Sequence, residues 1–321
     1  MKKNERNDKM VGGSMKKINI LDRKKINYSE LDNELKVEIA VLGGLDIFTD
    51  AHVQGVVNTT TKICEAMELD YDRTKKCILC AYLHDIGKVH IPSEVLQKNG
   101  KLTDEEYEIM KMHTVYGYEM CMRYEQFKSL APIVRAHHEH IDGSGYPDGL
   151  VESLIPEEAK LIKVADVYDA LTQRRQYKEG FKQSKAIQIM IEDVQKGKTG
   201  AKYIYFLVSY LVDELEKKIN EVEQGIILVK DNLETLKDLE VIYKQIYDQG
   251  YSNRLARKLA KYDLAAGYDM SANANLLVVN KQKLERLTAE LEDKKSERDI
   301  LKRQCKQLYR LVRNKEWNSS F

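Results

Sequence analysis

Apolar residues recur at helical spacing along most of the chain, and no strong alternation of apolar and polar positions indicates strands. The spacing predicts helices over about 52–69, 71–86 and 157–171. Thr103 and Glu106 have the spacing of a capping box, which predicts the start of a further helix that carries His113. We therefore expect an all-α fold.

The apolar pattern changes at about residue 207, where spacings of three and four alternate as in coiled coils. The first run contains Val208, Val212, Leu215, Ile219, Val222, Ile226, Val229, Leu233 and Leu236, and the second contains Leu284, Leu287, Leu291, Leu301, Cys305, Leu308 and Val312. The glycine-containing stretch 250–275 between them could turn the chain back. An antiparallel helical hairpin is the leading interpretation. A parallel dimer and a long helix packed on the preceding domain are the alternatives.

These patterns divide the chain into three regions. Residues 1–28 are polar and rich in lysine and asparagine, which predicts a flexible N-terminal segment. We expect 29–206 to form a helical domain, and 207–321 to form a coiled-coil or helical-hairpin region through which the protein forms a homodimer or docks a partner.

Composition narrows the functional classes. Charged residues make up 32% of the chain, and the formal net charge is only +1, so long nucleic acid is not an expected partner. No apolar run approaches the roughly 18 residues of a membrane span, and the N-terminus lacks the apolar core of a signal peptide. These observations predict a cytoplasmic protein. Cys77 and Cys80 lie in an apolar helix, which favours buried thiols over a zinc site.

The candidate chemistry lies in the histidines. All seven fall between positions 52 and 140, and several are grouped with aspartate. His84 and Asp85 follow an apolar helix, His137 and His138 are adjacent, and Asp166 lies in a further helical segment. Imidazole and carboxylate ligands suit borderline metals such as iron, manganese, zinc or nickel.

Several motifs resemble one known family. His84-Asp85-Ile-Gly-Lys88 resembles the signature of the HD hydrolase superfamily. The segment from His137 to Gly149, with its Gly-Ser-Gly-Tyr-Pro loop, resembles the HD-GYP subfamily, as does Val164 to Thr172. The resemblance covers about 46–180 and involves several motifs in the family's order.

The resemblance implies an HD-type helical bundle with two divalent metal ions, iron or manganese, that hydrolyses cyclic di-GMP to pGpG, with GMP as a further product. Two cations would lower the pKa of a shared water and clamp the phosphate for attack by a bridging hydroxide. The implied ligands, with Asp85 as the bridge, are His52, His84, Asp85, His113, His137, His138 and Asp166.

The resemblance also implies substrate contacts. Lys88 would stabilise charge on the phosphoryl group as a catalytic residue alongside Asp85. Arg175, Tyr177 and Tyr146 would contact the nucleotide. Three of them have a structural alternative: Lys88 as a surface lysine, Arg175 as an ion-paired arginine and Tyr146 as a residue that packs the loop. His90 and His140 match no ligand position, and we expect neither to bind metal.

The chain departs from the family pattern at a few positions. Phe48 stands where some members carry a glutamate that supports a third metal, so we expect two metals. Gly55, Gln176 and Lys178 also differ from the common residues, which weakens the inference about substrate more than that about catalysis. The alternatives are an HD hydrolase of another phosphoester or nucleotide, and a non-catalytic cyclic-dinucleotide receptor.

Overall fold

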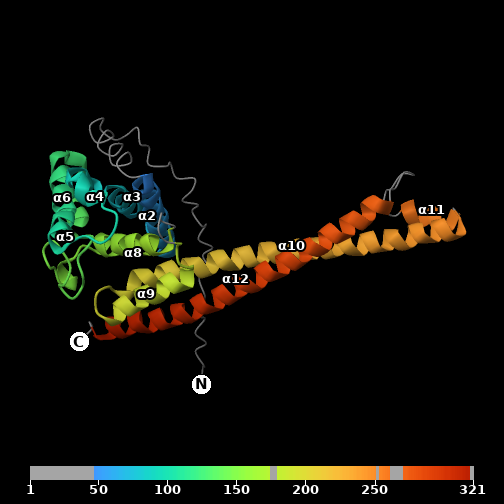
Figure 1. Ribbon diagram of the computed structural model, residues 1–321. Helices are drawn as coiled ribbons and strands as arrows, with labels where there is room; N and C mark the ends of the chain where they lie inside the picture. The colour runs from blue at the N-terminus through green and yellow to red at the C-terminus, as the bar shows by residue number, and fades with distance from the viewer. Residues whose placement is uncertain (1–46, 174–178, 251–252, 261–269, 319–321) are drawn as a thin grey trace, which may run out of the picture.

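The computed structural model describes residues 47–173, 179–250, 253–260 and 270–318 (Figure 1). Within these ranges the regular elements are helices, and an isolated β-bridge pairs Asp142 with Val151, so the predicted all-α class is confirmed. The α-helices are α2 (Ile47–Ala66), α3 (Tyr71–Leu83), α4 (Ser93–Leu96), α5 (Asp104–Lys111), α6 (His113–Arg123), α7 (Ala131–Ala136), α8 (Glu157–Thr172), α9 (Gln183–Gln195), α10 (Ala201–Gln249), α11 (Asn253–Ala260) and α12 (Met270–Asn318). The 3-10 turns are η3 (Ile86–His90), η4 (Glu125–Phe127) and η5 (Glu152–Leu154).

Helix ends occur at the positions where the chemistry was predicted. Helix α3 ends at Leu83, so His84 and Asp85 lie in the turn between α3 and η3. The capping box is present: the Thr103 side chain accepts from the Glu106 backbone N–H, and the Glu106 carboxylate accepts from the Thr103 N–H. The helix it opens, α5, ends at Lys111, and His113 begins α6. The sequence pattern had joined these two helices into one.

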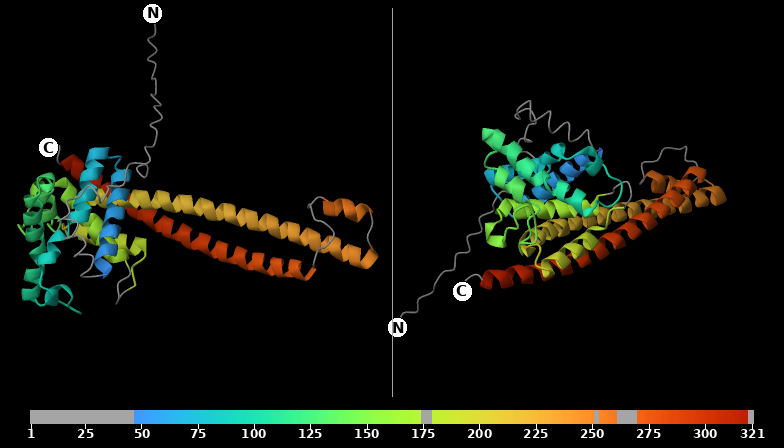
Figure 2. Two further views of the ribbon diagram at one scale, coloured as in Figure 1. Left: turned by 90° about the horizontal axis from the view of Figure 1, so that it is seen from above. Right: turned by 60° about the vertical axis from the view of Figure 1, so that its left-hand side comes forward.

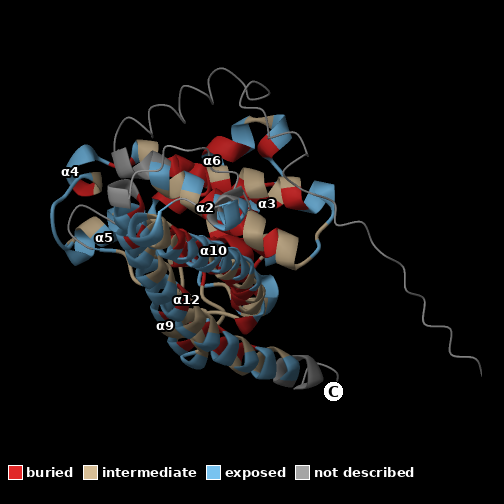
Figure 3. Ribbon diagram, turned by 90° about the vertical axis from the view of Figure 1, so that its right-hand side faces the viewer, coloured by how far each residue is buried: buried red, intermediate tan, exposed pale blue. Residues whose placement is uncertain are grey.

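The bundle formed by α2 to α9 packs around one apolar core. Helix α2 lies against α3, α8 and α10, and α6 lies against α7 and η3. The most deeply buried side chains include Ile63, Ile162, Ile187 and Leu207. The four cysteines of α2 to α9 are buried and free. Figure 3 shows buried residues concentrated in the bundle, whereas exposed residues cover most of α10 and α12.

Helices α10 and α12 are each 49 residues long and lie side by side (Figures 1 and 2). Ion pairs join Glu223 to Lys295 and Glu216 to Lys302, so later residues of one helix meet earlier residues of the other and the pair is antiparallel. Residues 219–249 of α10 and 270–295 of α12 extend away from the bundle, and we call them the arm. Apolar clusters run along it, built on Ile219, Ile226, Val229, Leu233, Leu277 and Leu291.

The base of this helix pair belongs to the bundle. Leu301 and Leu308 of α12 are fully buried in the same core as α2, α8 and α9. Glu297 accepts hydrogen bonds from the backbone N–H and hydroxyl of Ser184 in the first turn of α9, at 2.7 and 2.8 Å. Helix α10 runs without a break through position 207. The domain boundary expected there stays a prediction, and the flexible segment expected over 1–28 lies outside the described residues.

None of the described helices combines the length and apolar character needed to cross a membrane.

Candidate metal centre

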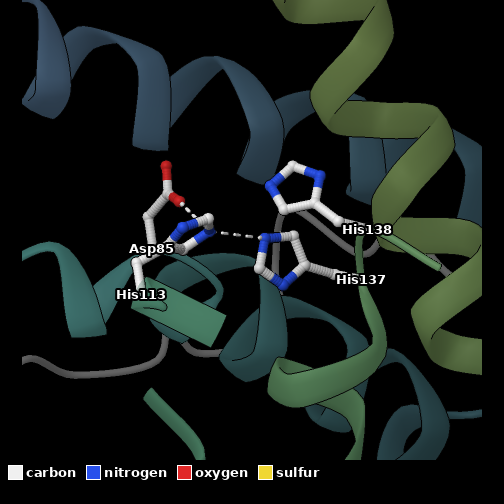
Figure 4. A group of neighbouring side chains, drawn as sticks. All are labelled: Asp85, His113, His137 and His138. Atoms are coloured by element: carbon white, nitrogen blue, oxygen red, sulfur yellow. Dashed lines mark hydrogen bonds and ion pairs between the residues drawn. The ribbon is translucent and has the colours of Figure 1, made fainter. Parts of the chain in front are cut away.

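The seven histidine and aspartate residues predicted as ligands come together at one end of the bundle. They come from α2, the turn after α3, the first residue of α6, the turn after α7, and α8. One group consists of Asp85, His113, His137 and His138, whose ligand atoms lie within 4.8 Å of one another (Figure 4). A second group consists of His52, His84 and Asp85. Asp85 belongs to both groups. The remaining residue is Asp166, whose Oδ1 atom lies 3.1 Å from the Nε2 atom of His52.

Three of the histidines are oriented in the same way by the backbone. The Nδ1 atoms of His84, His113 and His137 lie 2.8, 2.6 and 2.6 Å from the carbonyl oxygen three residues earlier. A carbonyl oxygen can only accept, so Nδ1 carries the proton and donates it. The lone pair is therefore on Nε2, the atom that faces the cluster. Such a hydrogen bond to the second nitrogen is typical of histidines that bind metal.

His52 is oriented by a side chain instead. Its Nδ1 lies 2.6 Å from Asp169 Oδ2, while its Nε2 faces Asp166 and Asp85. Asp169 is nearly fully buried one turn after Asp166 on α8. A Cβ at Gly55 would lie 1.8 Å from Asp169 Oδ1, so glycine is needed for this carboxylate to reach His52. The sequence motif contains Asp169, but its orienting role was not predicted.

Charge within the cluster favours ionised carboxylates, and burial favours neutral imidazoles at His137 and His138. Burial also acts to lower the His52 pKa, but the hydrogen bonds to Asp166 and Asp169 outweigh it and raise that pKa to about 9. Burial opposes ionisation of Asp85, but the Lys88 ammonium beside it outweighs burial and holds the Asp85 pKa well below its usual value. Burial lowers the pKa of His138 to about 3 and that of His137 well below its usual value. A carboxylate and unprotonated imidazoles are the forms that bind metal ions.

One further observation tests whether these residues fit a cation. His84 Nε2 and Asp85 Oδ1 are buried polar atoms for which the described part of the chain supplies no hydrogen-bond partner. Leaving such an atom unsatisfied costs about 1–3 kcal/mol. A divalent cation bound to both atoms would remove that cost, so the donor set fits a metal site of nitrogen and oxygen ligands.

The loop between α7 and η5 covers one side of the cluster. The Tyr146 ring stacks on the His138 ring, with centroids 4.8 Å apart and an interplanar angle of 30°. The buried Glu139 carboxylate accepts hydrogen bonds from the backbone N–H groups of Asp148, Gly149 and Leu150 at 2.7, 3.1 and 2.9 Å. Glu139 was not singled out from the sequence, although it directly follows the histidine pair.

The remaining predicted residues divide into three sets. Lys88 lies at the cluster, with its Nζ 2.6 Å from Asp85 Oδ2. His90 is exposed against the Tyr116 ring, and His140 Nδ1 lies 2.8 Å from the Ser144 hydroxyl, so neither lies in the cluster. Outside the described residues are Arg175, Gln176, Tyr177, Lys178 and the side chain of Phe48.

A helical bundle whose helices and connecting turns bring histidine and aspartate together around a shared carboxylate defines a metal-binding domain of the HD type. The family model described as HD domain matches residues 23–202, more than half of the chain, and the chain belongs to this family. The predicted resemblance to the HD superfamily and its HD-GYP branch is confirmed.

Named relatives are similar over the same region. The chain is 42% identical over 151 residues to the cyclic di-GMP phosphodiesterase response regulator RpfG of Xanthomonas campestris, covering 45% of this chain and 38% of that protein. It is 42% identical over 135 residues to a cyclic di-GMP phosphodiesterase of Thermotoga maritima, covering 41% and 37%. It is 32% identical over 175 residues to the 3'3'-cGAMP-specific phosphodiesterase 1 of Vibrio cholerae, covering 54% and 40%. Each match spans less than half of the relative's length.

Proposed function

We propose that this protein is a two-metal phosphodiesterase that hydrolyses cyclic di-GMP to linear pGpG, with GMP formed if a second cleavage follows. The observation that carries the proposal is the position of Asp85, whose carboxylate is shared by two groups of possible ligands. The names of the relatives support a cyclic dinucleotide as the substrate class.

The chain's own residues have distinct roles in this proposal. His52, His84 and Asp166 would hold one cation, His113, His137 and His138 would hold the other, and Asp85 would be shared by both. When bound, such a pair of cations supplies a water of lowered pKa and positive charge for the phosphate oxygens. Asp169 holds the His52 ring in the orientation that presents Nε2.

Lys88 is the proposed residue for phosphate charge. Its side chain is about one quarter exposed, and its ammonium lies at the edge of the cluster against Asp85. From there it would contact a phosphoryl oxygen as a point charge. Tyr146, stacked on His138, would contact the nucleotide, and Arg175 and Tyr177 are proposed to do so from the segment after α8.

We expect the two ions to be iron or manganese. The donor set consists of imidazole and carboxylate, which suits either of them, and no cysteine belongs to the two ligand groups found among the described residues. The phenylalanine at position 48 cannot bind a cation, which supports two ions rather than three.

A second cyclic dinucleotide, 3'3'-cGAMP, is an alternative substrate because one relative is named for it. Another phosphoester or nucleotide is a broader alternative. A non-catalytic receptor is the alternative outside the enzyme class, and the complete ligand set is the observation that argues against it.

A substrate panel tests these alternatives. The protein, purified without oxygen, is incubated with cyclic di-GMP, 3'3'-cGAMP or pGpG and either Fe(II) or Mn(II), and the products are separated by chromatography. We expect cyclic di-GMP to be converted fastest, and His137→Ala to abolish conversion while the exposed control His90→Ala retains it. Faster conversion of 3'3'-cGAMP would identify cGAMP as the substrate instead. Tight binding without turnover under either metal would favour a non-catalytic receptor.

The C-terminal region is proposed as an association surface, with a second copy of the chain as the first occupant to test. Large apolar side chains are exposed on both helices of the arm, among them Leu228, Leu276, Val278 and Val279. Light scattering should give the mass of a dimer, and Leu228→Glu combined with Val279→Glu should give a monomer. A monomeric wild-type protein would leave a different partner protein as the occupant. A cytoplasmic location stays a prediction.

A further inference from the structure

An aromatic surface continues outward from the metal centre. The Tyr146 ring lies between His138, on which it stacks, and Tyr107 of α5, whose ring centroid is 6.3 Å away at 79°. The His113 ring also meets Tyr146, edge to face at 6.4 Å. The series His138, Tyr146, Tyr107 therefore leads from a proposed ligand to the surface of the domain.

The outer end of this series is open to solvent. No residue of α5 is buried, and Tyr107 is 48% exposed. A tyrosine combines a large flat apolar surface with a polar tip, and it is enriched where proteins bind ligands and partners. An exposed aromatic ring beside a proposed nucleotide-hydrolysing centre offers a surface on which a base can stack.

Lys111 adds a positive charge to the same place. It lies one turn after Tyr107 on α5, and its Nζ is 5.5 Å from the Tyr107 ring centroid and 5.8 Å from that of Tyr146. Its ion-pair partner is Glu108, whose side chain is 69% exposed. Exposed pairs of this kind are weak, so a ligand anion can replace Glu108.

The loop that carries Tyr146 is held by several contacts that do not involve Tyr107. Glu139 already fixes that loop through three backbone N–H groups, and Arg135 binds Asp148 with two hydrogen bonds of 2.6 and 2.7 Å. Tyr107 comes from a separate helix that packs on the bundle only at its edge. Tyr107 therefore adds an exposed ring beside a loop that other contacts already fix.

We propose that Tyr107, Tyr146 and Lys111 form a nucleobase subsite, in which one purine of the substrate stacks on the Tyr107 ring and meets the Tyr146 ring edge to face while its phosphodiester lies at the metal centre. This inference rests on the proposed function and deepens it. Lys111 contacts the oxygen-rich edge of the base or the second phosphate. Every base has an aromatic face, so the subsite adds affinity for cyclic dinucleotides in general.

The test compares substrates with and without a base. Tyr107→Ala, Tyr107→Phe and Lys111→Ala are assayed with cyclic di-GMP and with methyl 4-nitrophenyl phosphate, a phosphodiester that lacks a purine. Ile109→Ala is the matched control, because Ile109 is a similarly exposed residue on the same helix. Stacking on an aromatic side chain changes affinity by about tenfold or more per base.

We expect Tyr107→Ala to raise the KM for cyclic di-GMP about tenfold with little change in kcat, and Lys111→Ala to raise it less. Tyr107→Phe should stay close to wild type, because its ring still stacks. Hydrolysis of methyl 4-nitrophenyl phosphate should be the same in all variants. Unchanged KM in Tyr107→Ala, or an equal loss on both substrates, would overturn the subsite.

A binding assay distinguishes failure of the proposed function from failure of the subsite. If the wild-type protein hydrolyses no cyclic dinucleotide, calorimetric titration with cyclic di-GMP replaces the kinetic assay. Weaker binding by Tyr107→Ala than by Ile109→Ala would then support the subsite in a receptor. Equal binding by the two variants, or no binding by the wild type, would overturn it.

Discussion

The bundle and the arm are built from different kinds of contact. In the bundle, buried charged groups are packed among apolar side chains, and several, such as Glu139 and Asp169, make hydrogen bonds to loops or rings that they orient. In the arm, buried residues are almost all aliphatic, and the charged residues lie on the outside, where they pair across the two helices. Burying a charge is costly unless it is paired. The buried charged groups of the bundle are therefore not explained by packing alone, whereas apolar packing accounts for the arm.

The largest effect is expected from removing the shared carboxylate. Asp85→Ala should lose both metals and reduce turnover below detection, because Asp85 belongs to both groups of ligand atoms. Metal analysis by mass spectrometry and product chromatography measure the two losses. A variant with full metal content and full rate would contradict the proposed centre.

Lys88→Ala should lower the rate of hydrolysis without loss of the metal ions. Lys88 is proposed to stabilise charge in the transition state, and removing such a group typically costs about 100-fold in kcat. We expect the variant to keep its metals, since a lysine ammonium is not a ligand. An unchanged kcat would instead assign Lys88 to a structural ion pair with Asp85.

Asp169→Asn should weaken metal binding by about 10- to 100-fold, the usual effect of changing a residue that orients a metal-binding histidine. The asparagine keeps the size of the side chain but loses the carboxylate that His52 contacts at 2.6 Å. Titration of the metal-depleted protein with Mn(II) measures the effect, with His90→Ala as the control. Equal affinity in the two variants would show that Asp169 does not act through His52.

A pair of leucines in α12 tests how far the bundle extends. Leu301 is fully buried in the core of the bundle, whereas Leu287 is partly buried in the arm. Leu301→Ala should destabilise the protein by about 2–5 kcal/mol, and Leu287→Ala by less. Denaturant unfolding followed by circular dichroism measures both. Equal losses would mean that the base of α12 is no more a part of the bundle than the arm is.

The smallest effect concerns Glu157 at the start of α8. Burial opposes its ionisation, but hydrogen bonds from Lys160 and Tyr203 outweigh it and lower the Glu157 pKa to about 2. Its pKa in the unfolded chain is higher, so its contribution to stability is present above about pH 4.5 and is lost as the pH falls towards 2. Glu157→Gln should flatten the acid side of the stability profile. An identical slope in both proteins would contradict this.

The sequence predicted the candidate site far better than the surroundings that orient it. Histidine and aspartate in this order have few other uses, so the seven ligand candidates could be named from the chain alone. The roles of Asp169 and Glu139 depend on which ring or loop lies opposite them, and only the tertiary fold brings those partners together. The contact of Tyr107 could not be predicted either, because its ring meets Tyr146 from a separate helix.

The packing partners of the helices also could not be predicted from the sequence. Heptad spacing predicted two long helices. An apolar stripe shows that a helix packs against another surface, but it does not specify which surface. It could not show that Leu301 and Leu308 would pack into the bundle while Leu287 would not. The division between α5 and α6 at Met112 was also missed, since both helices have good helix-forming residues and the break places His113 at a helix start.

Counting the metal ions in the wild-type protein tests the central claim most directly. The protein is purified anaerobically with Fe(II) or Mn(II), dialysed, and analysed for metal and protein concentration in the same sample. We predict about two ions per chain, in agreement with two groups of ligands that share Asp85. One ion per chain, or none, would contradict a two-metal centre.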